Sequence, residues 1–391
     1  MTEASAEASA EASAEVVFDA PGGPLQLRRF PRREGELLRA WDAADDYLLQ
    51  HLQDEAGADG AVWVINDGFG ALTVALAAAG RPVCMSSDSW LAHESTRANL
   101  RDNGLAEASA QLLDSLEPPT MPVTTVLVKI PKSLALLEDQ LHRIRPHVGS
   151  GVRIVGAGMT KSIHLSTLGL FDSILGPTTT SKAVRKARLV LCDFAADLDP
   201  GPNPHPTTYR LDGSEWELSN HAGLFSHERL DAGTAHLLAQ IPSAATVQHI
   251  VDLGCGNGVV GLVAAQRNPA ATLSFIDESY RAVASAQHNW QSVFGDSRPA
   301  VFAVGDGLDL VATGSADMIL CNPPFHQSNA MGDATAWRMF TGARRALAPG
   351  GTLLIVGNRH LAYHAKLRRL FGRCDVLHSD ARFVVLRSRS R

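Results

Sequence analysis

The chain has 391 residues, of which 45% are apolar and 19% charged, and its formal net charge is −6. This length predicts two or three domains, and the composition is typical of a soluble globular protein. No run of about 18 or more apolar residues is present, so we expect no transmembrane helix. The negative total charge does not by itself indicate nucleic-acid binding.

The sequence also indicates a reduced, cytoplasmic protein. Its first residues contain no basic segment followed by an apolar one, as a secretory signal would require. The five cysteines are scattered and never form a Cys-x-x-Cys pair, so the sequence supports neither a disulfide framework nor a zinc site. We therefore expect no metal and no membrane association.

Two stretches of unusual composition predict the domain boundaries. Residues 1–16 repeat Ala-Ser-Ala-Glu three times, which is typical of a disordered acidic tail. Residues 197–210 contain four prolines in a short polar run and are typical of an interdomain linker. The intervening ranges, 17–196 and 211–391, are the two expected domains.

In the first expected domain, an apolar strand runs into a glycine turn between Val62 and Gly70. Asp88 follows Asp67 by 21 residues. A later apolar strand, residues 125–128, leads into Lys129-Ile130-Pro131-Lys132.

The second expected domain has a fuller glycine turn. Its strand, Ile250 to Leu253, leads into Gly254-Cys255-Gly256-Asn257-Gly258 and then an Ala-rich helical stretch. Glycines let the backbone approach a ligand at a helix N-terminus, and from Gly256 they fit the dinucleotide pattern Gly-x-Gly-x-x-Gly. Asp252 is poorly suited to a phosphate and suits a cationic ligand, such as the amino or sulfonium end of S-adenosylmethionine. The glycines alone do not decide between these ligands.

Two further acids follow expected strands. Asp277 ends an apolar run 25 residues after Asp252, a spacing that fits one helix and one strand and places it near ribose hydroxyls. Asp306 follows the strand Ala300 to Val304, where it could contact an adenine amino group. Any one of these acids could instead be a capping or turn residue.

The most informative run is Asn322-Pro323-Pro324-Phe325, directly after the apolar residues 318–321. Two prolines cannot continue a central strand, so the chain leaves the sheet here. The run presents an amide, bare carbonyls and a ring at a strand's carboxyl end, where open α/β sheets bind ligands. An amino group on a flat base requires two acceptors and a stacking surface of this kind.

The two halves look like one unit used twice. The Val62 and Ile250 segments match. Asp88 lies 21 residues after Asp67, as Asp277 lies 25 after Asp252, which aligns these acids in pairs. Asn99 then follows Asp88 by 11 residues, as Asn289 follows Asp277 by 12. Because Lys129 stands where the second half has an amide, we expect a duplicated α/β domain whose first copy has lost catalysis. Such a duplication is compatible with a monomer. The alternative is chance similarity between two generic α/β domains.

Positive charge is concentrated locally. Residues 359–391 hold nine Lys or Arg against two Asp, and smaller basic clusters lie at residues 28–33 and 182–188. These clusters are either solvated surfaces or parts of an RNA footprint.

The second half resembles class I S-adenosylmethionine-dependent methyltransferases. The whole chain is similar to two-domain ribosomal RNA guanine-N2 methyltransferases, in which a degenerate domain precedes an active one. Three segments look most like the branch that acts on large-subunit (23S) RNA: Gly223 to Asp231, Asn322 to Gln327, and Gly357 to His364. The resemblance implies two tandem Rossmann-like domains, each with a mostly parallel seven-stranded sheet.

The resemblance also implies residue roles. The methionine end of the cofactor would be held by Asp252, Gly254 and Gly256, the ribose by Asp277 and the adenine by Asp306. The segment closing over the cofactor would contain Phe225, Ser226 and Asp231. The target amino group would be bound by Asn322 and the carbonyl of Pro323, and the flipped guanine would stack on Phe325. On the RNA side would lie His326 and Arg359.

Other functions remain open at this stage. One is the same chemistry on a 16S guanine. Another is methylation of a protein glutamine amide, although such sites usually have Tyr where this chain has Phe325. A third is a non-catalytic ribosomal RNA assembly factor, which the complete glycine turn and Asn322 disfavour.

Overall fold

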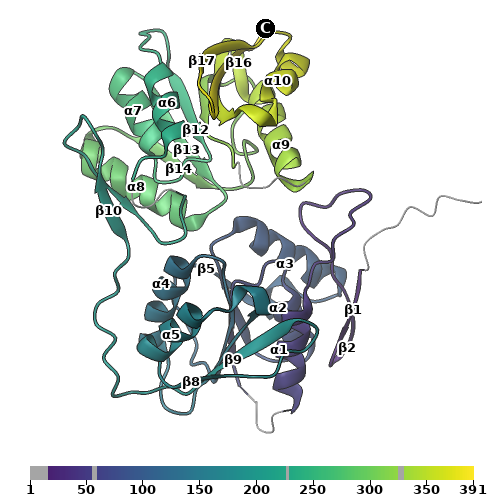
Figure 1. Cartoon of the computed structure of the whole chain (residues 1–391). Coiled ribbons are helices and arrows are strands. Elements are labelled where there is room, and N and C mark those ends of the chain that lie inside the picture. The colour runs from purple at the N-terminus through teal and green to yellow at the C-terminus, as the bar shows by residue number, and fades with distance from the viewer. Residues whose placement is uncertain (1–15, 55–59, 226–228, 325–329) are drawn as a thin grey trace, which may run out of the picture. The chain divides into compact units, whose positions relative to one another are not determined.

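The computed structural model describes residues 16–54, 60–225, 229–324 and 330–391, with the side chains of 330–333 left out. Apart from residue 16, the expected acidic tail lies outside these residues and stays a prediction. The chain forms two compact units that divide between Asn203 and Pro204 (Figure 1). This division lies inside the expected linker, whose last four residues form a strand.

The first unit alternates strands and helices after an initial hairpin. Its strands are β1 (Val17–Ala20), β2 (Gly23–Gln26), β3 (Val62–Ile65), β4 (Val83–Ser87), β5 (Gln111–Asp114), β6 (Thr125–Lys129), β7 (Arg153–Met159), β8 (Thr178–Thr180) and β9 (Ala187–Cys192). Its α-helices are α1 (Ala43–Asp54), α2 (Ala71–Ala78), α3 (Trp90–Asp102), α4 (Leu134–Ile144) and α5 (Leu165–Ile174).

The second unit repeats that sequence of elements. Its strands are β10 (Thr207–Arg210), β11 (Glu217–Asn220), β12 (His249–Leu253), β13 (Thr272–Asp277), β14 (Ala300–Val304), β15 (Ala316–Cys321), β16 (Leu347–Asn358), β17 (Asp375–Ser379) and β18 (Phe383–Arg389). Its α-helices are α6 (Ala232–Gln240), α7 (Val259–Arg267), α8 (Tyr280–Phe294), α9 (Ala330–Ala346) and α10 (Tyr363–Phe371).

Within the described residues, each unit contains one seven-stranded sheet, and the two sheets have the same topology. The strand orders are β5-β4-β3-β6-β7-β9-β8 and β14-β13-β12-β15-β16-β18-β17. All neighbouring pairs are parallel except those made by β9 and by β18, which are antiparallel. The expectation of mostly parallel, seven-stranded α/β sheets is confirmed.

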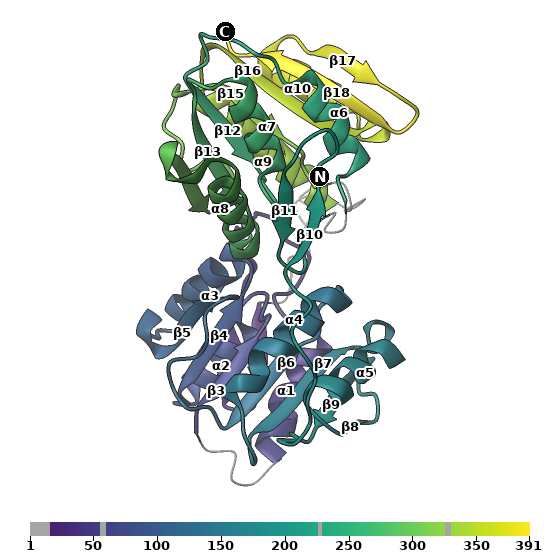
Figure 2. The same ribbon diagram turned by 90° about the vertical axis from the view of Figure 1, so that its left-hand side faces the viewer.

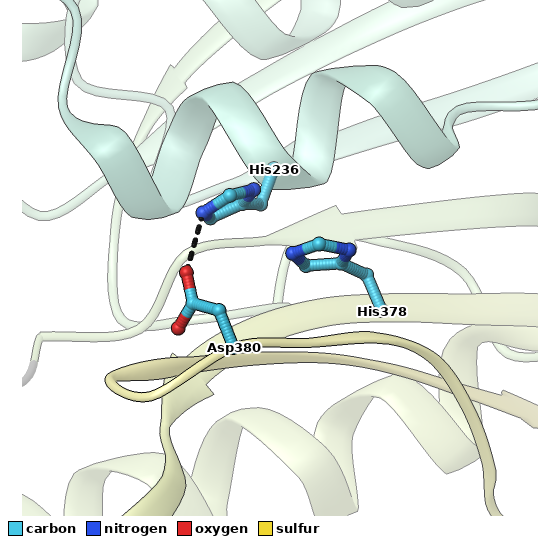
Figure 3. A group of neighbouring side chains, drawn as sticks. All are labelled: His236, His378 and Asp380. Carbon is cyan, nitrogen blue, oxygen red and sulfur yellow. Dashed lines mark ion pairs between the residues drawn. The ribbon is translucent and has the colours of Figure 1, made fainter.

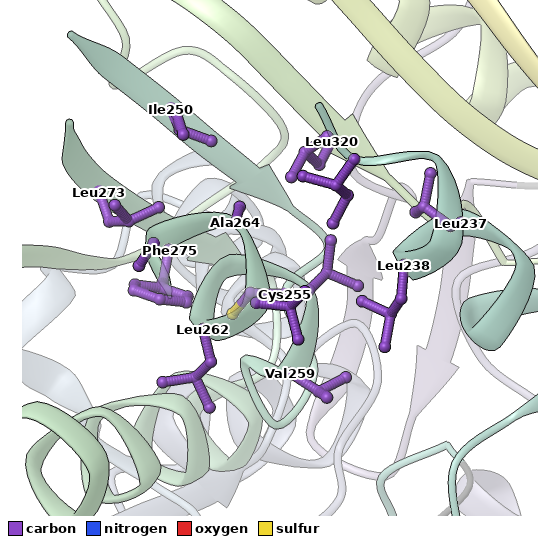
Figure 4. Packing of buried hydrophobic residues seen from close by; sticks show 14 of the residues in the cluster. Leu237, Leu238, Ile250, Cys255, Val259, Leu262, Ala264, Leu273, Phe275 and Leu320 are labelled. Carbon is purple, nitrogen blue, oxygen red and sulfur yellow. The ribbon is translucent and has the colours of Figure 1, made fainter. Parts of the chain in front are cut away.

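Helices cover both faces of each sheet, as buried parallel strands require (Figure 2). In the second unit, α6, α7 and α8 contribute to the apolar cluster on one face, and α9 and α10 to that on the other. Figure 4 shows Leu237 and Leu238 of α6 and Val259 and Leu262 of α7 gathered in the first of these clusters. The first unit has the same two layers.

The sheet order reverses between β12 and β15, and this is the position where open α/β sheets bind ligands. The two strands end level with each other, because Leu253 pairs with Cys321 in the parallel register. The glycine turn and Asn322 therefore leave the sheet side by side at its carboxyl edge.

Candidate functional site

The turn between β12 and α7 depends on left-handed backbone at three positions. Gly254, Gly256 and Gly258 have φ values of 71°, 53° and 83°, which side chains disfavour. The backbone N–H of Gly254 donates to the carbonyl of Ile276 at 2.8 Å, so the turn is fastened to the neighbouring strand β13.

A fourth glycine serves packing. A Cβ on Gly261 would overlap the ring of Phe275, so α7 can lie this close to β13 only with glycine there. The N–H of Gly261 donates to the Oδ2 of Asp252 at 2.7 Å, which ties the strand end to the first turn of α7.

Asp252 is an unusual acid because its residue is only 2% exposed. Its pKa is raised from an ordinary 3.8 to about 8, mainly by burial and also by the charge of Asp277, although the hydrogen bond from Gly261 lowers it. A buried carboxyl group with one hydrogen bond and a raised pKa would be stabilised in its ionised form by a cationic group placed beside it.

Asp277 connects the end of β13 to the glycine turn. Its Oδ2 accepts from the N–H of Gly256 at 3.0 Å, and its Oδ1 accepts from the N–H of Ser279 at 3.1 Å. The carboxylate is thereby held at the sheet edge next to Gly256.

Asp306 forms an ion pair that the sequence did not reveal. Its Oδ2 lies 2.9 Å from Nη1 of Arg338 in α9. An adenine amino group bound there would share this carboxylate with Arg338.

Asn322 has its amide fixed on one side. Its Nδ2 donates to Oγ1 of Thr234 in α6 at 2.8 Å. Its buried Oδ1 has no hydrogen-bond partner among the residues that the structure describes. An acceptor is therefore left at the sheet edge, as the amide role requires, and Pro323 beside it is buried.

The remaining predicted residues are only partly placed. Ser226, Phe325 and His326 lie outside the described residues, and their roles stay predictions. The neighbouring Phe225 is 53% exposed. Arg359 is exposed, and its Nη1 donates to the backbone carbonyl of Asp380 at 3.0 Å.

Asp231, expected near the cofactor, caps α6. Its Oδ2 accepts from the N–H of Thr234 at 2.9 Å and from the hydroxyl of the same residue at 3.3 Å. Aspartate is a favoured N-cap residue because it satisfies such free N–H groups.

Asn289 of α8 holds the glycine turn through hydrogen bonds. In the sequence this residue was visible only through the repeated spacing. Its Nδ2 donates to the carbonyls of Asn257 at 2.9 Å and Ser219 at 2.8 Å. Asn99 does the same in the first unit, donating to Phe69 at 2.8 Å and Arg28 at 3.0 Å. The signal was present in the sequence, but a buried amide that binds two carbonyls cannot be distinguished there from a surface residue.

The first unit carries different groups at the matching positions. The pairing registers of the central strands, together with the glycine before α2 and α7, match the two units residue by residue. Val64 then stands at the position of Asp252, and Ser87 at that of Asp277. Spacing had aligned Asp67 with Asp252 and Asp88 with Asp277, and both alignments are wrong. Asp67 lies three residues further along, inside the turn, where it accepts from Thr73 at 2.9 Å and from Gly70 at 3.0 Å.

Lys129 stands at the position of Asn322 and makes ion pairs. Its Nζ lies 2.7 Å from both Asp42 and Asp45 at the start of α1, and its side chain is 15% exposed. Burial raises the pKa of Asp45 to about 6, although Lys129 opposes this rise. The side chain of Lys129 offers no acceptor oxygen, and its backbone carbonyl already accepts from Nδ2 of Asn66 at 3.0 Å.

One cluster of metal-binding residue types exists among the described residues, at His236, His378 and Asp380 (Figure 3). Nε2 of His236 lies 2.8 Å from Oδ2 of Asp380, and the two imidazole rings stack with centroids 4.3 Å apart and planes 25° apart. Stacked rings direct their nitrogens alongside each other. A bound metal lies near the plane of each imidazole ligand, so both rings would have to turn to share an ion.

Among the helices that the structure describes, none is long and apolar enough to cross a membrane.

Two family models match the chain. The RLMG N-terminal domain matches residues 15–196, and the methyltransferase small domain matches residues 215–387.

Curated relatives are similar over almost the full length. A protein of Streptomyces avermitilis named ribosomal RNA large subunit methyltransferase G is 52% identical, over 94% of this chain and 97% of the relative. Proteins of the same name from Streptomyces coelicolor and Ectopseudomonas mendocina are 50% and 46% identical, over 94% and 95% of this chain and 98% and 99% of theirs.

A solved structure that matches this chain covers both units. It is a T. thermophilus 16S rRNA N2-guanine methyltransferase in complex with AdoMet and guanosine. The TM-score is 0.75 at 22% identity, and the match covers 96% of this chain and 97% of that one. At this identity the likeness shows a shared fold.

Proposed function

The chain belongs to the ribosomal RNA large subunit methyltransferase G family, and from this premise we propose that it methylates the N2 amino group of a specific guanine in 23S ribosomal RNA. The methyl donor is S-adenosylmethionine. The observation that carries this proposal is the buried Oδ1 of Asn322, which has no hydrogen-bond partner in the part of the chain that the structure describes. It lies beside the glycine turn at the reversal point of the second sheet.

The carboxyl end of β12 suits a ligand with a cationic end. Asp252 is a buried acid that a cation would stabilise in its ionised form, and its raised pKa marks that need. The methionine end would be held by Asp252, Gly254 and Gly256, the ribose by Asp277 and the adenine by Asp306. Residues 225, 226 and 231 belong to the segment that closes over it.

The residues at Asn322 activate the nitrogen. The lone pair of the guanine amino group is conjugated with the ring, so the nitrogen is a poor nucleophile. Acceptance of its two hydrogens by Oδ1 of Asn322 and the carbonyl of Pro323 pulls it toward tetrahedral geometry and directs the lone pair.

The bound cofactor supplies an electrophilic methyl group. The protein's contribution is to hold donor and acceptor close and in line, which accounts for much of the rate, and the surplus proton leaves to water. The base must be flipped out of its stack, and Phe325 would receive it. His326 and Arg359 would lie on the RNA side. This chemistry balances without a metal.

We assign the first unit a non-catalytic role in docking or stability. Val64, Ser87 and Lys129 replace the three groups that the second unit offers to cofactor and substrate. The ammonium of Lys129 would repel a sulfonium and cannot accept a hydrogen bond. The domain limits that we propose are 17–196, 197–210 as linker, and 211–391, in a monomeric cytoplasmic protein.

The test is transfer of labelled methyl to protein-free 23S RNA, 16S RNA and total protein from a strain that lacks this gene, in parallel. We expect label on 23S RNA that digests to N2-methylguanosine. Label on 16S RNA alone would preserve the chemistry and overturn the substrate. Label only on protein would support glutamine methylation, and no label would support an assembly factor.

A further inference from the structure

Asn322 can serve as an acceptor only if its amide has one of two orientations. Oxygen and NH2 occupy nearly the same space on opposite sides of an amide, and only the hydrogen-bond network decides between them. If the amide were turned over, NH2 would face the target amino group and would repel it. The protein therefore needs a device that fixes the orientation.

The neighbour of Asn322 could by itself support either orientation. A threonine hydroxyl both donates and accepts, so Oγ1 of Thr234 could face an amide oxygen or an amide NH2. In the structure Nδ2 of Asn322 lies 2.8 Å from this hydroxyl, which is the orientation that leaves Oδ1 for the target amino group.

Asp231 removes the choice. Its Oδ2 already accepts from the backbone N–H of Thr234 at 2.9 Å, and the hydroxyl of Thr234 donates to the same oxygen at 3.3 Å. Because a hydroxyl has a single proton, its lone pairs then face Asn322, which must present NH2 to them. Thr234 is 7% exposed, so water has little access to exchange this arrangement.

The first unit shows that this contact is built into the fold. Counting from the starts of α1 and α6, Asp42 matches Asp231 and Asp45 matches Thr234. In the first unit the start of α1 contacts the end of β6 through ion pairs. Asp42 and Asp45 each lie 2.7 Å from Nζ of Lys129. In the second unit Asp231 keeps its charge, but Thr234 and Asn322 are neutral where Asp45 and Lys129 are charged. Among the described residues, Oδ1 of Asn322 is then left without a hydrogen-bond partner.

We infer that Thr234, with its hydroxyl proton held by the N-cap carboxylate of Asp231, is a positioning residue that sets the amide orientation of Asn322 for methyl transfer. The inference rests on the proposed function, since it concerns the acceptor of that reaction. It gives Asp231 a role at the nucleophile in addition to its expected place beside the cofactor.

The first experiment compares Thr234→Val with Thr234→Ser. Valine keeps the shape and the backbone N–H, whereas serine keeps the hydroxyl. We expect kcat to fall about tenfold in Thr234→Val, the effect of losing one neutral hydrogen bond, with KM and the Kd for S-adenosylmethionine unchanged. Serine should restore most of the rate. Equal kcat values for wild type and Thr234→Val would overturn the inference.

A matched control separates positioning from packing. Thr73 in the first unit is also a buried threonine whose hydroxyl donates to an aspartate, at 2.8 Å to Asp67. Thr73→Val should lower stability without changing kcat. A comparable loss of kcat in Thr73→Val would show that the Thr234 effect is structural.

A double-mutant cycle gives an independent readout. If Thr234 acts through Asn322, adding Thr234→Val to Asn322→Ala should lower the residual rate no further. Additive losses would contradict the inference. Failure of the wild type to methylate RNA would instead refute the proposed function, so the two failures are distinguishable.

Discussion

The two units share a topology and differ where the central strands end. In the second unit, Asp252, Asp277 and Asn322 leave polar atoms at the sheet edge. In the first, matching positions are filled by Val64, by Ser87, and by Lys129 with its two carboxylates. The comparison teaches that this edge of the fold can take two forms. It can offer polar groups to a ligand, as we propose for the open site of the second unit, or be filled by its own ion pairs, as in the closed site of the first.

The glycine turn makes the same point. The first turn of each helix, α2 or α7, is tied down by an aspartate, but from different positions in the chain. Asp252 ties Gly261 from inside the strand, whereas Asp67 ties Thr73 from inside the turn. The shared requirement is an acceptor for the helix N–H groups, and only the first solution also places an acid at the end of the central strand.

The largest effect should come from opening the closed site. Lys129→Ala leaves Asp45 buried without its cation, which should cost about 3 kcal/mol of unfolding free energy, the lower end for breaking a buried pair. Chemical denaturation measures this, with the exposed Lys132→Ala as the matched control within about 0.5 kcal/mol of wild type. The kcat of the folded Lys129→Ala protein should be unchanged. A large loss of kcat would give the first unit a catalytic role.

The next effect should come from emptying the open site. Asn322→Ala removes the acceptor and should lower kcat by about a hundredfold or more, as for other groups that act on the transition state. Calorimetry should find the affinity for S-adenosylmethionine nearly intact. Rates like those of the wild type would exclude the amide as acceptor.

A steric difference between the units gives a third prediction. Gly261→Ala forces a Cβ against Phe275, whereas the first unit has Thr73 and Met85 at the positions that match Gly261 and Phe275. We expect Gly261→Ala to lose about 1–3 kcal/mol of stability through overpacking. Thermal unfolding should show partial recovery when Phe275→Met is added. No recovery would mean that the strain lies in the turn and not in the ring contact.

The smallest effect concerns Asp252 and pH. Its pKa is raised from 3.8 to about 8 on folding, so the folded protein holds this proton more tightly than the unfolded chain. Below about pH 4 this carboxyl group is protonated in both states, so its titration does not lower the free energy of unfolding. As pH rises from about 4 to about 8, the free energy of unfolding falls. A cationic ligand favours the ionised form, so affinity for S-adenosylmethionine should rise over pH 6–8 with release of a proton.

Calorimetry in buffers of different ionisation enthalpy measures that proton. Asp252→Asn serves as the control, because its side chain cannot titrate, and it should flatten the pH dependence. An unchanged dependence in Asp252→Asn would assign the proton to another group.

The fold was largely predictable because its signals are local. Buried strands that end in glycine turns, and prolines that stop a strand at Asn322, follow from backbone sterics. The duplication was visible from spacing, but spacing could not show that Val64 and Ser87, and not the nearby acids, occupy the matching positions. Asp67 and Asp88 were therefore aligned wrongly, by three residues and by one.

Contacts between residues that are far apart in the chain could not be predicted from the sequence. Thr234 reaches Asn322 across 88 residues, and Arg338 reaches Asp306 from another helix. Nothing in their local patterns distinguishes them from an ordinary helix residue, because only the packing of α6 and α9 against the sheet brings them to the site. Asp231 was identified through the family resemblance, but its connection to the amide of Asn322 through Thr234 became visible only in the structure.

The most direct test of the difference between the units is the stoichiometry of S-adenosylmethionine binding by calorimetry. We expect one site per chain, weakened at least about tenfold by Asp277→Ala and unaffected by Ser87→Ala at the matching position of the first unit. Two sites per chain, or one site that is lost in Ser87→Ala and kept in Asp277→Ala, would contradict the assignment of cofactor binding to the second unit.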